Sequence, residues 1–407
     1  MQKKSYHLLV ASLYFNYIFQ GMAAIILSQN MNELKVFWQA TTSQVTLVMS
    51  AIGLGRVLVL YFSGYFSDHF GRKKTVIIAI VSYAIFFLGL LLSRNYLGAA
   101  FFALFGGVSN AFLDTSTYPT LMEAYPNQRV NSSLSVLNKA FISTGQFILP
   151  FLTRFLIQRG LFFGWTFILC AICLLANMIL LISLSFPPLS TREVPTNNDE
   201  RTFYKPTNHG IFRLDGTALL VFSFVSVSIF NIFILWIPQF VEEAGITTHE
   251  NSLMFVSIYS AGSFISVFLT SAIVKNGVHI PKFILFCLIV SASALFMMLV
   301  YPVFISVFIA SILIGLFAAG GIWQLGLMLM LEMFPVYKGK CTSYYSLATA
   351  IGIMVIPYIT GNLNDLLGIN AIFWFNFLLV LIGLCAALMI TMRYNKLFKK
   401  TEETVIL

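Results

Sequence analysis

The chain has 407 residues, of which 58% are hydrophobic and only 10% charged, with a mean hydropathy of +0.87 and a formal net charge of +9. A soluble domain usually has about 25% charged residues, so this composition excludes an ordinary water-soluble protein. Apolar runs of about 20 residues recur from end to end, long enough to cross a bilayer as helices, and the short alternating segments of a membrane β-barrel are absent. The cations cluster in short loops, which predicts a membrane topology rather than nucleic-acid binding.

Twelve membrane spans are predicted, so the fold class is an all-α membrane protein. The first apolar run is too long for a cleaved signal peptide and is expected to remain as the first span. The polar stretch 187–213, rich in Pro, Asn and Thr, is a predicted linker between an N-terminal six-helix bundle (1–186) and a C-terminal six-helix bundle with a short cytoplasmic tail (214–407). The predicted spans are 7–29, 42–66, 75–93, 97–122, 132–156, 163–186, 215–239, 251–274, 282–301, 303–332, 342–363 and 370–392.

The distribution of Lys and Arg predicts the orientation of the spans. With the N-terminus inside, the inner segments hold 18 of the 24 Lys and Arg residues and the outer segments hold four. The positive-inside rule then places both termini in the cytoplasm. Twelve retained spans and few cysteines are typical of a bacterial plasma-membrane protein. The two remaining cations, Arg56 and Lys139, fall within spans.

The two halves of the chain resemble each other. The stretch "LMEAYPNQR" (121–129) aligns with "MLEMFPVYK" (330–338), which pairs Glu123 with Glu332 and Arg129 with Lys338. Both stretches are expected to end the fourth helix of their half, and these four residues are interpreted as a cytoplasmic gate. Internal repeats of this kind build many transporters, with the substrate site between the repeats near mid-membrane.

The hairpin "GYFSDHFGRKKT" (64–75) follows the second predicted span on the inner side. It resembles the signature loop between helices 2 and 3 of the major facilitator superfamily, with departures at Phe66 and His69. The resemblance implies two pseudo-symmetric six-helix bundles that rock about a central cavity. A monomer is implied as well, since members of this family are mostly monomers. It also implies a cytoplasmic latch that holds the outward-facing state. The latch residues are Gly64, Asp68, Gly71 and Arg72.

The residue types in this hairpin suit a latch. Gly64 lets the second helix pack closely against a neighbour, and Gly71 permits the tight turn. Asp68 can pair with Arg72 or face the positive N-terminus of a helix. The alternative is a plain loop whose cations only hold the hairpin inside. Asp68 argues against that alternative, because a carboxylate weakens the positive bias.

Three charged residues are predicted near mid-membrane: Arg56, Asp114 and Lys139 lie about 12–16 Å from the inner boundary, at 1.5 Å rise per residue. A charge there costs about 2.5–3.5 kcal/mol, which makes each a candidate functional residue. No histidine lies well inside a span, so Asp114 is the candidate proton carrier. Its pairing with Arg56 or Lys139 as a purely structural ion pair is the alternative. Two cations against one acid leave a positive charge, and we expect Arg56 to hold an anionic substrate.

Further residues are predicted to line the substrate site. They are Asn110, Trp323 and Gln324, and at the repeat shift Trp323 takes the place of Asp114. The chain has no Walker loop, no specific Ser–His–Asp set and no metal-binding spacing, so an enzyme, a cofactor and a metal are not expected. The five cysteines fit neither a disulfide framework nor a zinc site.

The sequence therefore predicts a secondary active transporter that takes up a small organic anion, a hydroxy- or sugar-type acid, with protons by alternating access. Its partners would be the small-molecule substrate, the proton and the lipid bilayer. Two transporter alternatives stay open, an antiporter that exports drugs or lipophilic cations and a transporter of neutral sugars. A membrane receptor or scaffold that does not transport is the alternative from another class.

Overall fold

The computed structural model describes residues 6–125, 128–188, 211–275, 277–334 and 338–398, and within them it consists of helices with no strand. The helical elements are α1 (His7–Gln29), α2 (Met31–Phe37), α3 (Thr42–Phe70), α4 (Arg72–Leu92), α5 (Tyr96–Ala124), α6 (Gln128–Gln158), α7 (Trp165–Ser183), η1 (Phe212–Gly216), α8 (Thr217–Glu243), α9 (His249–Ser252), α10 (Met254–Lys275), α11 (Ile280–Val300), α12 (Phe304–Ile314), η2 (Gly315–Ala319), α13 (Ile322–Met333), α14 (Lys338–Leu367) and α15 (Ile369–Phe398).

The predicted all-α membrane fold is confirmed. Within the described residues, twelve helical stretches are long and apolar enough to cross a membrane, and each overlaps one predicted span. The ends differ by a few residues, most at α15, which continues to Phe398 instead of ending near residue 392. Helix ends are harder to place from sequence, because polar and apolar residues mix where a helix leaves the membrane.

One predicted span, 303–332, is not a single regular helix. After α12 the chain forms the π-helical turn η2, bends at Gly320 and Gly321, and resumes as α13. Two hydroxyls of α10 bind carbonyl groups at this break. Ser266 donates to the carbonyl of Leu316, and Thr270 donates to the carbonyl of Gly320 at 3.4 Å. Irregular backbone at membrane depth is stable when neighbouring side chains take up its freed polar groups.

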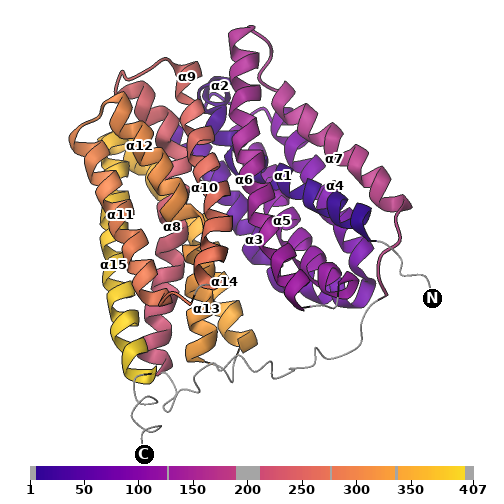
Figure 1. Ribbon diagram of the computed structural model, residues 1–407. Coiled ribbons are helices and arrows are strands. Elements are labelled where there is room, and N and C mark those ends of the chain that lie inside the picture. Colours follow the sequence, from indigo (N-terminus) through magenta and orange to yellow (C-terminus); the bar gives the residue numbers. More distant parts are fainter. Residues whose placement is uncertain (1–5, 126–127, 189–210, 276, 335–337, 399–407) are drawn as a thin grey trace, which may run out of the picture.

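Helices of the first half and of the second half gather on opposite sides of the molecule, as the change from indigo and magenta to orange and yellow shows (Figure 1). The halves meet along two helix pairs, α3 with α14 and α6 with α10. In the first pair, Gly53 lies against the backbone of Met354 and Gly361 lies against Thr46. Residue numbers fall along α3 as they rise along α14, so the two helices are antiparallel.

The two ends of the molecule differ. We call the end where α3 turns into α4 at Gly71 the motif end, and the end where α2 and α9 lie the far end, at the top of Figure 1. Between described residues, the hydrogen bonds that join the halves lie from mid-depth to the far end; they are Ser143 with Ser263 (3.1 Å), Ser257 to the carbonyl of Phe147 (2.8 Å), Gln239 to the carbonyl of Ser28 (3.2 Å), Asn32 with His249 (3.3 Å) and the amide of Ser43 to Asp365 (3.0 Å). The protein is therefore closed at the far end and open at the motif end.

Candidate functional site

Close packing of α3 on α5 brings two of the predicted mid-membrane charges together. A Cβ at Gly55 would lie 2.1 Å from the carbonyl oxygen of Leu104, and one at Gly107 would lie 2.0 Å from that of Ile52. Only glycine fits at such approaches, and small residues are what allow membrane helices to pack this tightly. Arg56 follows Gly55 directly, so the side chain starts from the point of closest approach.

Arg56 and Asp114 form an ion pair at this contact. The Nη2 atom of Arg56 donates to Oδ2 of Asp114 at 3.0 Å, which confirms that the two charges share one depth. The buried Tyr17 of α1 donates its hydroxyl to the other carboxylate oxygen at 3.1 Å. The side chains of Arg56 and Asp114 keep 23% and 20% of their surface exposed, so the pair is accessible to water and protons.

Lys139 does not take part in that pair. Its Nζ lies 5.0 Å from the ring centroid of Phe230, which belongs to α8 in the other half of the protein. Within the described part of the chain, no carboxylate lies within ion-pair distance of Lys139. A cation over an aromatic face gains about 0.5–2 kcal/mol, less than the insertion cost of its charge. The predicted surplus positive charge is therefore present, and it sits on Lys139, not on Arg56.

Other predicted lining residues lie on both sides. Asn110 accepts a hydrogen bond from the hydroxyl of Tyr83 within the first half. In the second half, Trp323 donates its indole N–H to Thr349 at 2.6 Å, and Tyr345 donates to the carbonyl of Trp323 at 2.9 Å. These two bonds tie the first turn of α13, directly after the break in the tenth span, to α14. Gln324, the next residue, is exposed.

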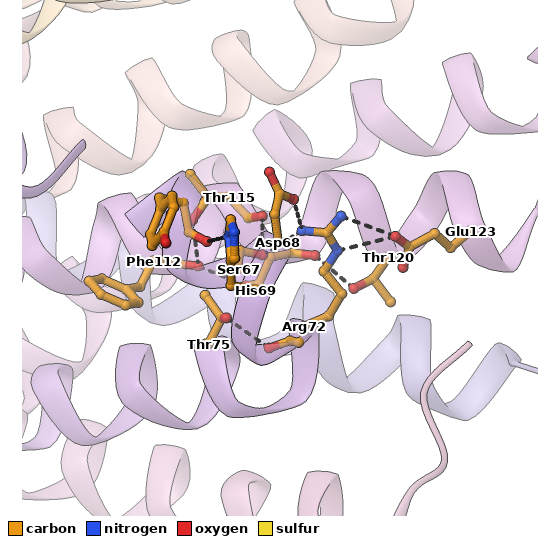
Figure 2. Close-up of polar contacts among 12 residues, drawn as sticks. Ser67, Asp68, His69, Arg72, Thr75, Phe112, Thr115, Thr120 and Glu123 are labelled. Carbon is orange, nitrogen blue, oxygen red and sulfur yellow. Dashed lines mark hydrogen bonds and ion pairs between the residues drawn. The ribbon is translucent and has the colours of Figure 1, made fainter. Parts of the chain in front are cut away.

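The signature hairpin is a compact network around Arg72, which Figure 2 shows between two carboxylates. Its guanidinium donates to Asp68 at 2.6 Å, to Glu123 at 3.1 and 3.2 Å, and to the hydroxyl of Ser67 at 2.7 Å. Ser67 donates in turn to the carbonyl of Thr115 at 2.9 Å. The predicted Asp68–Arg72 pair is confirmed, and Arg72 joins the ends of α3 and α5 to the start of α4.

The two glycines of the hairpin behave differently. Gly71 has φ +93°, a conformation that other residues rarely adopt, so the predicted tight turn is confirmed. The close packing expected at Gly64 is wrong for this conformation, because a Cβ built there meets no heavy atom within 4 Å. Asp68 is also open to solvent, with 66% of its side chain exposed. Gly64 and Asp68 therefore lie on a side of α3 that faces open space in this conformation.

The structure describes the side chains of two of the four predicted gate residues. Glu123 and Glu332 each precede the last residue of their helix, α5 and α13, as the internal repeat predicts. Glu123 is neutralised by Arg72, whereas Glu332 accepts a hydrogen bond from the hydroxyl of Tyr394 at 3.0 Å. The side chains of Arg129 and Lys338 lie outside the described residues.

Two residues of the mid-membrane site were not singled out from the sequence. Tyr17 and Phe230 each adjoin an asparagine, Asn16 and Asn231, in a predicted span. Nothing in a single sequence distinguishes them from the many aromatic residues that only pack helices, since aromatics make up 15% of the chain. Their contacts with Asp114 and Lys139 arise from different helices and become visible only in the folded protein.

Within the described residues, twelve helices that could span a membrane lie in two halves that are closed at one end, with charges at mid-depth, which is the architecture of a membrane transporter. Comparison with known proteins gives the family: residues 9–281 and 279–405 match the model of the Major Facilitator Superfamily. The chain belongs to this superfamily, is a secondary transporter, and is a multi-pass plasma-membrane protein.

Curated relatives span nearly the whole chain. Inner membrane transport protein YdiM of Escherichia coli (strain K12) is 35% identical over 97% of this chain and 96% of its own length. The uncharacterized MFS-type transporter YfkL of Bacillus subtilis (strain 168) is 35% identical over 95% and 96%. Inner membrane transport protein YdiN of Escherichia coli (strain K12) is 30% identical over 98% and 93%.

Solved structures support the same fold. The inward open conformation of the xylose transporter XylE from E. coli superposes with a TM-score of 0.74 at 14% identity, covering 95% of this chain and 96% of that one. A D-xylose-proton symporter matches with a TM-score of 0.73 at 16% identity, over 95% and 97%. Identities this low establish the architecture and leave the substrate to be argued from the residues themselves.

Proposed function

We propose that the protein is a proton-coupled transporter of a small organic anion, with Lys139 as the anion-binding cation. The observation that carries the proposal is the charge balance at mid-membrane: Asp114 is taken by Arg56, and Lys139 reaches toward the other half with an aromatic ring as its partner. A cation in this place is stabilised most by a charge brought in from outside. A carboxylate supplies such a charge and accepts a charge-assisted hydrogen bond.

The same geometry suggests how proton and anion binding are linked. A proton on Asp114 removes the negative charge that holds Arg56, so the guanidinium also becomes free to bind a carboxylate. Tyr17 can keep its hydrogen bond to the protonated acid, which leaves the carboxyl in place. Because linkage is reciprocal, a bound anion that draws Arg56 away also favours protonation of Asp114. The two ligands would then bind and leave together, as uptake by symport requires.

The remaining expectations fit this mechanism as parts of the proposal. The motif end, richer in Lys and Arg, would face the cytoplasm with both termini, following the positive-inside rule. The bundles 1–186 and 214–407 would rock about the linker 187–213, in a protein that works as a monomer. The hairpin at Asp68 would latch the motif end in the outward-facing state, and Glu123, Arg129, Glu332 and Lys338 would line the cytoplasmic gate.

The body of the substrate would meet the second half. Trp323 and Gln324 follow the break in the tenth span, and discontinuous helices commonly mark substrate sites in transporters. An indole face with an exposed amide beside it suits a hydroxy- or sugar-type acid. A neutral sugar would use Trp323, Gln324 and Asn110 in the same way and would leave Lys139 without a counter-charge, which is why we favour an acid.

The test is electrical. The purified protein is reconstituted in liposomes on a solid support, and currents are recorded on addition of small carboxylic acids, neutral sugars and lipophilic cations, at acidic and at neutral pH. We expect currents with acids, larger at acidic pH, that disappear in Lys139→Gln and Arg56→Gln. Lys396→Gln removes an exposed cation at the motif end and serves as the matched control, with currents like the unmodified protein.

The outcomes separate the alternatives. Currents with sugars that persist in Lys139→Gln would show that the substrate is a neutral sugar and not an anion. A response to lipophilic cations and none to acids would assign an exporter and reduce Arg56 and Lys139 to structural charges. No response to any class in a protein that remains folded would favour a receptor or scaffold.

A further inference from the structure

The pattern of the signature hairpin occurs a second time in the chain. Residues 64–71 read "GYFSDHFG", and residues 361–368 read "GNLNDLLG". Both have the form Gly, three residues, Asp, two residues, Gly, with large apolar residues at the third and seventh positions. The second copy lies in the eleventh span, so it does not follow from the internal repeat, which would pair the second span with the eighth.

The two copies have the same local structure. Asp68 and Asp365 are each the third residue from the end of their helix, α3 and α14. The closing glycines, Gly71 and Gly368, have φ values of +93° and +80°, and each ends its helix. Because α3 and α14 run antiparallel, one copy lies at the motif end and the other at the far end.

The copy at the far end is docked on the other half. The carboxylate of Asp365 accepts a hydrogen bond from the backbone N–H of Ser43, in the first turn of α3, at 3.0 Å. Thr41 and Gln44 form a reciprocal capping box at this N-terminus, which uses the N–H groups of those two residues and leaves that of Ser43 for Asp365. A carboxylate at the N-terminus of a helix is stabilised by the free N–H groups and by the helix dipole.

The first glycines of the two copies differ in packing: Gly361 is in close contact with another helix, and Gly64 is not. A Cβ at Gly361 would lie 1.8 Å from Oγ1 of Thr46 and 3.1 Å from the Cα of Ser43, so the start of α3 rests directly on this glycine. A Cβ at Gly64 would meet nothing within 4 Å. The close helix contact expected for Gly64 is thus made by Gly361, at the end that is closed.

The antiparallel register places residues 64–71, the copy that is not docked, at the level of the start of α14. Met354 lies against Gly53, and Asp365 lies against Ser43. Continued toward the motif end, the same register brings Asp68 opposite the first residues of α14, which begins at Lys338. In this register each helix ends in an Asp at the level of the N-terminus of the other, and between described residues only Asp365 contacts that N-terminus in this conformation.

We propose that 361–368 is a second latch, and that the two copies close opposite ends of the protein in turn. When the far end is closed, as here, Asp365 holds the N-terminus of α3 and Gly361 admits its backbone. When the halves rock, Asp365 and Gly361 separate from α3, while Asp68 and Gly64 close on the start of α14. One antiparallel helix pair would then carry a similar lock at both ends, so neither state is favoured by a lock alone.

The proposal is tested by conformation and needs no substrate. Spin labels replace the exposed Met122 and Met392 at the motif end, or the exposed Val36 and Tyr301 at the far end, and distance distributions are recorded in lipid nanodiscs. We expect Asp365→Asn to raise the ratio of far-end-open to far-end-closed protein about fivefold, which corresponds to the upper value for a charge removed from an exposed helix N-terminus. Asp68→Asn should lower that ratio by a similar factor, and the double variant should return it close to the original value.

Steric variants give an independent reading. Gly361→Val should prevent the far end from closing, and Gly64→Val should leave this conformation unchanged while it prevents the motif end from closing. Asp365→Glu retains the charge, and Asn362→Ala alters a half-buried neighbour whose side chain donates to the carbonyl of Tyr358 within α14, so neither should move the ratio more than about twofold. Distances in Asp365→Asn and Gly361→Val that match the unmodified protein would overturn the proposal, whatever Asp68→Asn does.

Discussion

The two halves differ most at mid-depth, where they face one another. The first half places two cations and one acid there, Arg56, Lys139 and Asp114. The second half places aromatic rings and hydroxyls, in which Trp323 bonds to Thr349 and lies 5.4 Å from the ring of its neighbour Tyr345. At this depth the first half therefore carries the charges, and the second half carries aromatic and hydroxyl groups.

Under the proposed function, this difference divides recognition of the substrate between the two halves. A charge near mid-membrane costs about 2.5–3.5 kcal/mol, so it is concentrated where one acid can balance one of two cations. The uncharged half carries no such cost and can shape a surface for the body of the substrate. We expect variants in the first half to change whether an anion is carried, and variants in the second half to change how tightly it is held.

The largest effect should come from Lys139. Lys139→Gln removes the cation that has no carboxylate partner, and we expect uptake of the anion to fall at least about 100-fold, near 3 kcal/mol of lost binding. Lys139→Arg keeps the charge and should retain measurable uptake. Radiolabelled uptake into proteoliposomes measures both. Equal activity in the glutamine variant and the unmodified protein would remove the difference between the halves.

Asp114 should control the dependence on pH. In Asp114→Asn no proton can be exchanged, so uptake should become independent of pH between acidic and neutral conditions, while exchange of labelled for unlabelled anion continues. Arg56 loses its partner in this variant, which keeps a cation available to the anion. Counterflow measured beside net uptake distinguishes the two. Net uptake that still rises at acidic pH would place the proton elsewhere.

The motif ends of the halves should differ in stability. Arg72→Gln leaves Glu123, whose side chain is 7% exposed, without its cation, and should lower the free energy of unfolding by about 2 kcal/mol. Glu332→Gln should change it by less than about 0.5 kcal/mol, because the amide oxygen still accepts from Tyr394. Thermal unfolding followed by tryptophan fluorescence in detergent compares the pair. A larger loss at Glu332 than at Arg72 would contradict the geometry of both contacts.

The smallest effect should come from Trp323. Trp323→Phe removes the indole N–H that bonds to Thr349 but keeps a ring, and we expect KM for the anion to rise about three- to tenfold with little change in maximal rate. Thr349→Val removes the acceptor and should give a smaller rise in KM. An unchanged KM in both would show that this surface does not touch the substrate.

Much of the fold was predictable from local features. Runs of apolar residues bounded by Lys, Arg and Pro located the twelve spans, since a helix that crosses lipid must be about 20 residues long. Gly71 predicted its own turn, because a positive φ is a property of that residue and its neighbours. The break at Gly320 and Gly321 was not predicted, because it depends on hydroxyls that α10 brings to η2 and to Gly320.

The sequence predicted which charged residues lie in the candidate site but not which of them pair with one another. The shared depth of Arg56 and Asp114 followed from counting residues along two helices. Which cation would pair with the acid did not, because the choice rests on glycines that press α3 on α5, whereas α6, which carries Lys139, packs mainly on α1 and α10. The close packing foreseen at Gly64 was wrong for this conformation for the same reason: a glycine allows contact, but the arrangement of the helices decides whether a partner is there.

The sequence by itself determined the class of protein, the number of spans and the inventory of membrane-embedded charges, because transfer into lipid acts on each residue of a helix separately. Only the tertiary structure decided that Lys139 has no carboxylate partner among the described residues, and that Asp365 rather than Asp68 is docked. Both depend on which helices lie side by side and at which end the halves have closed. Such contacts join residues far apart in the chain, and their energies exist only once both helices are in place.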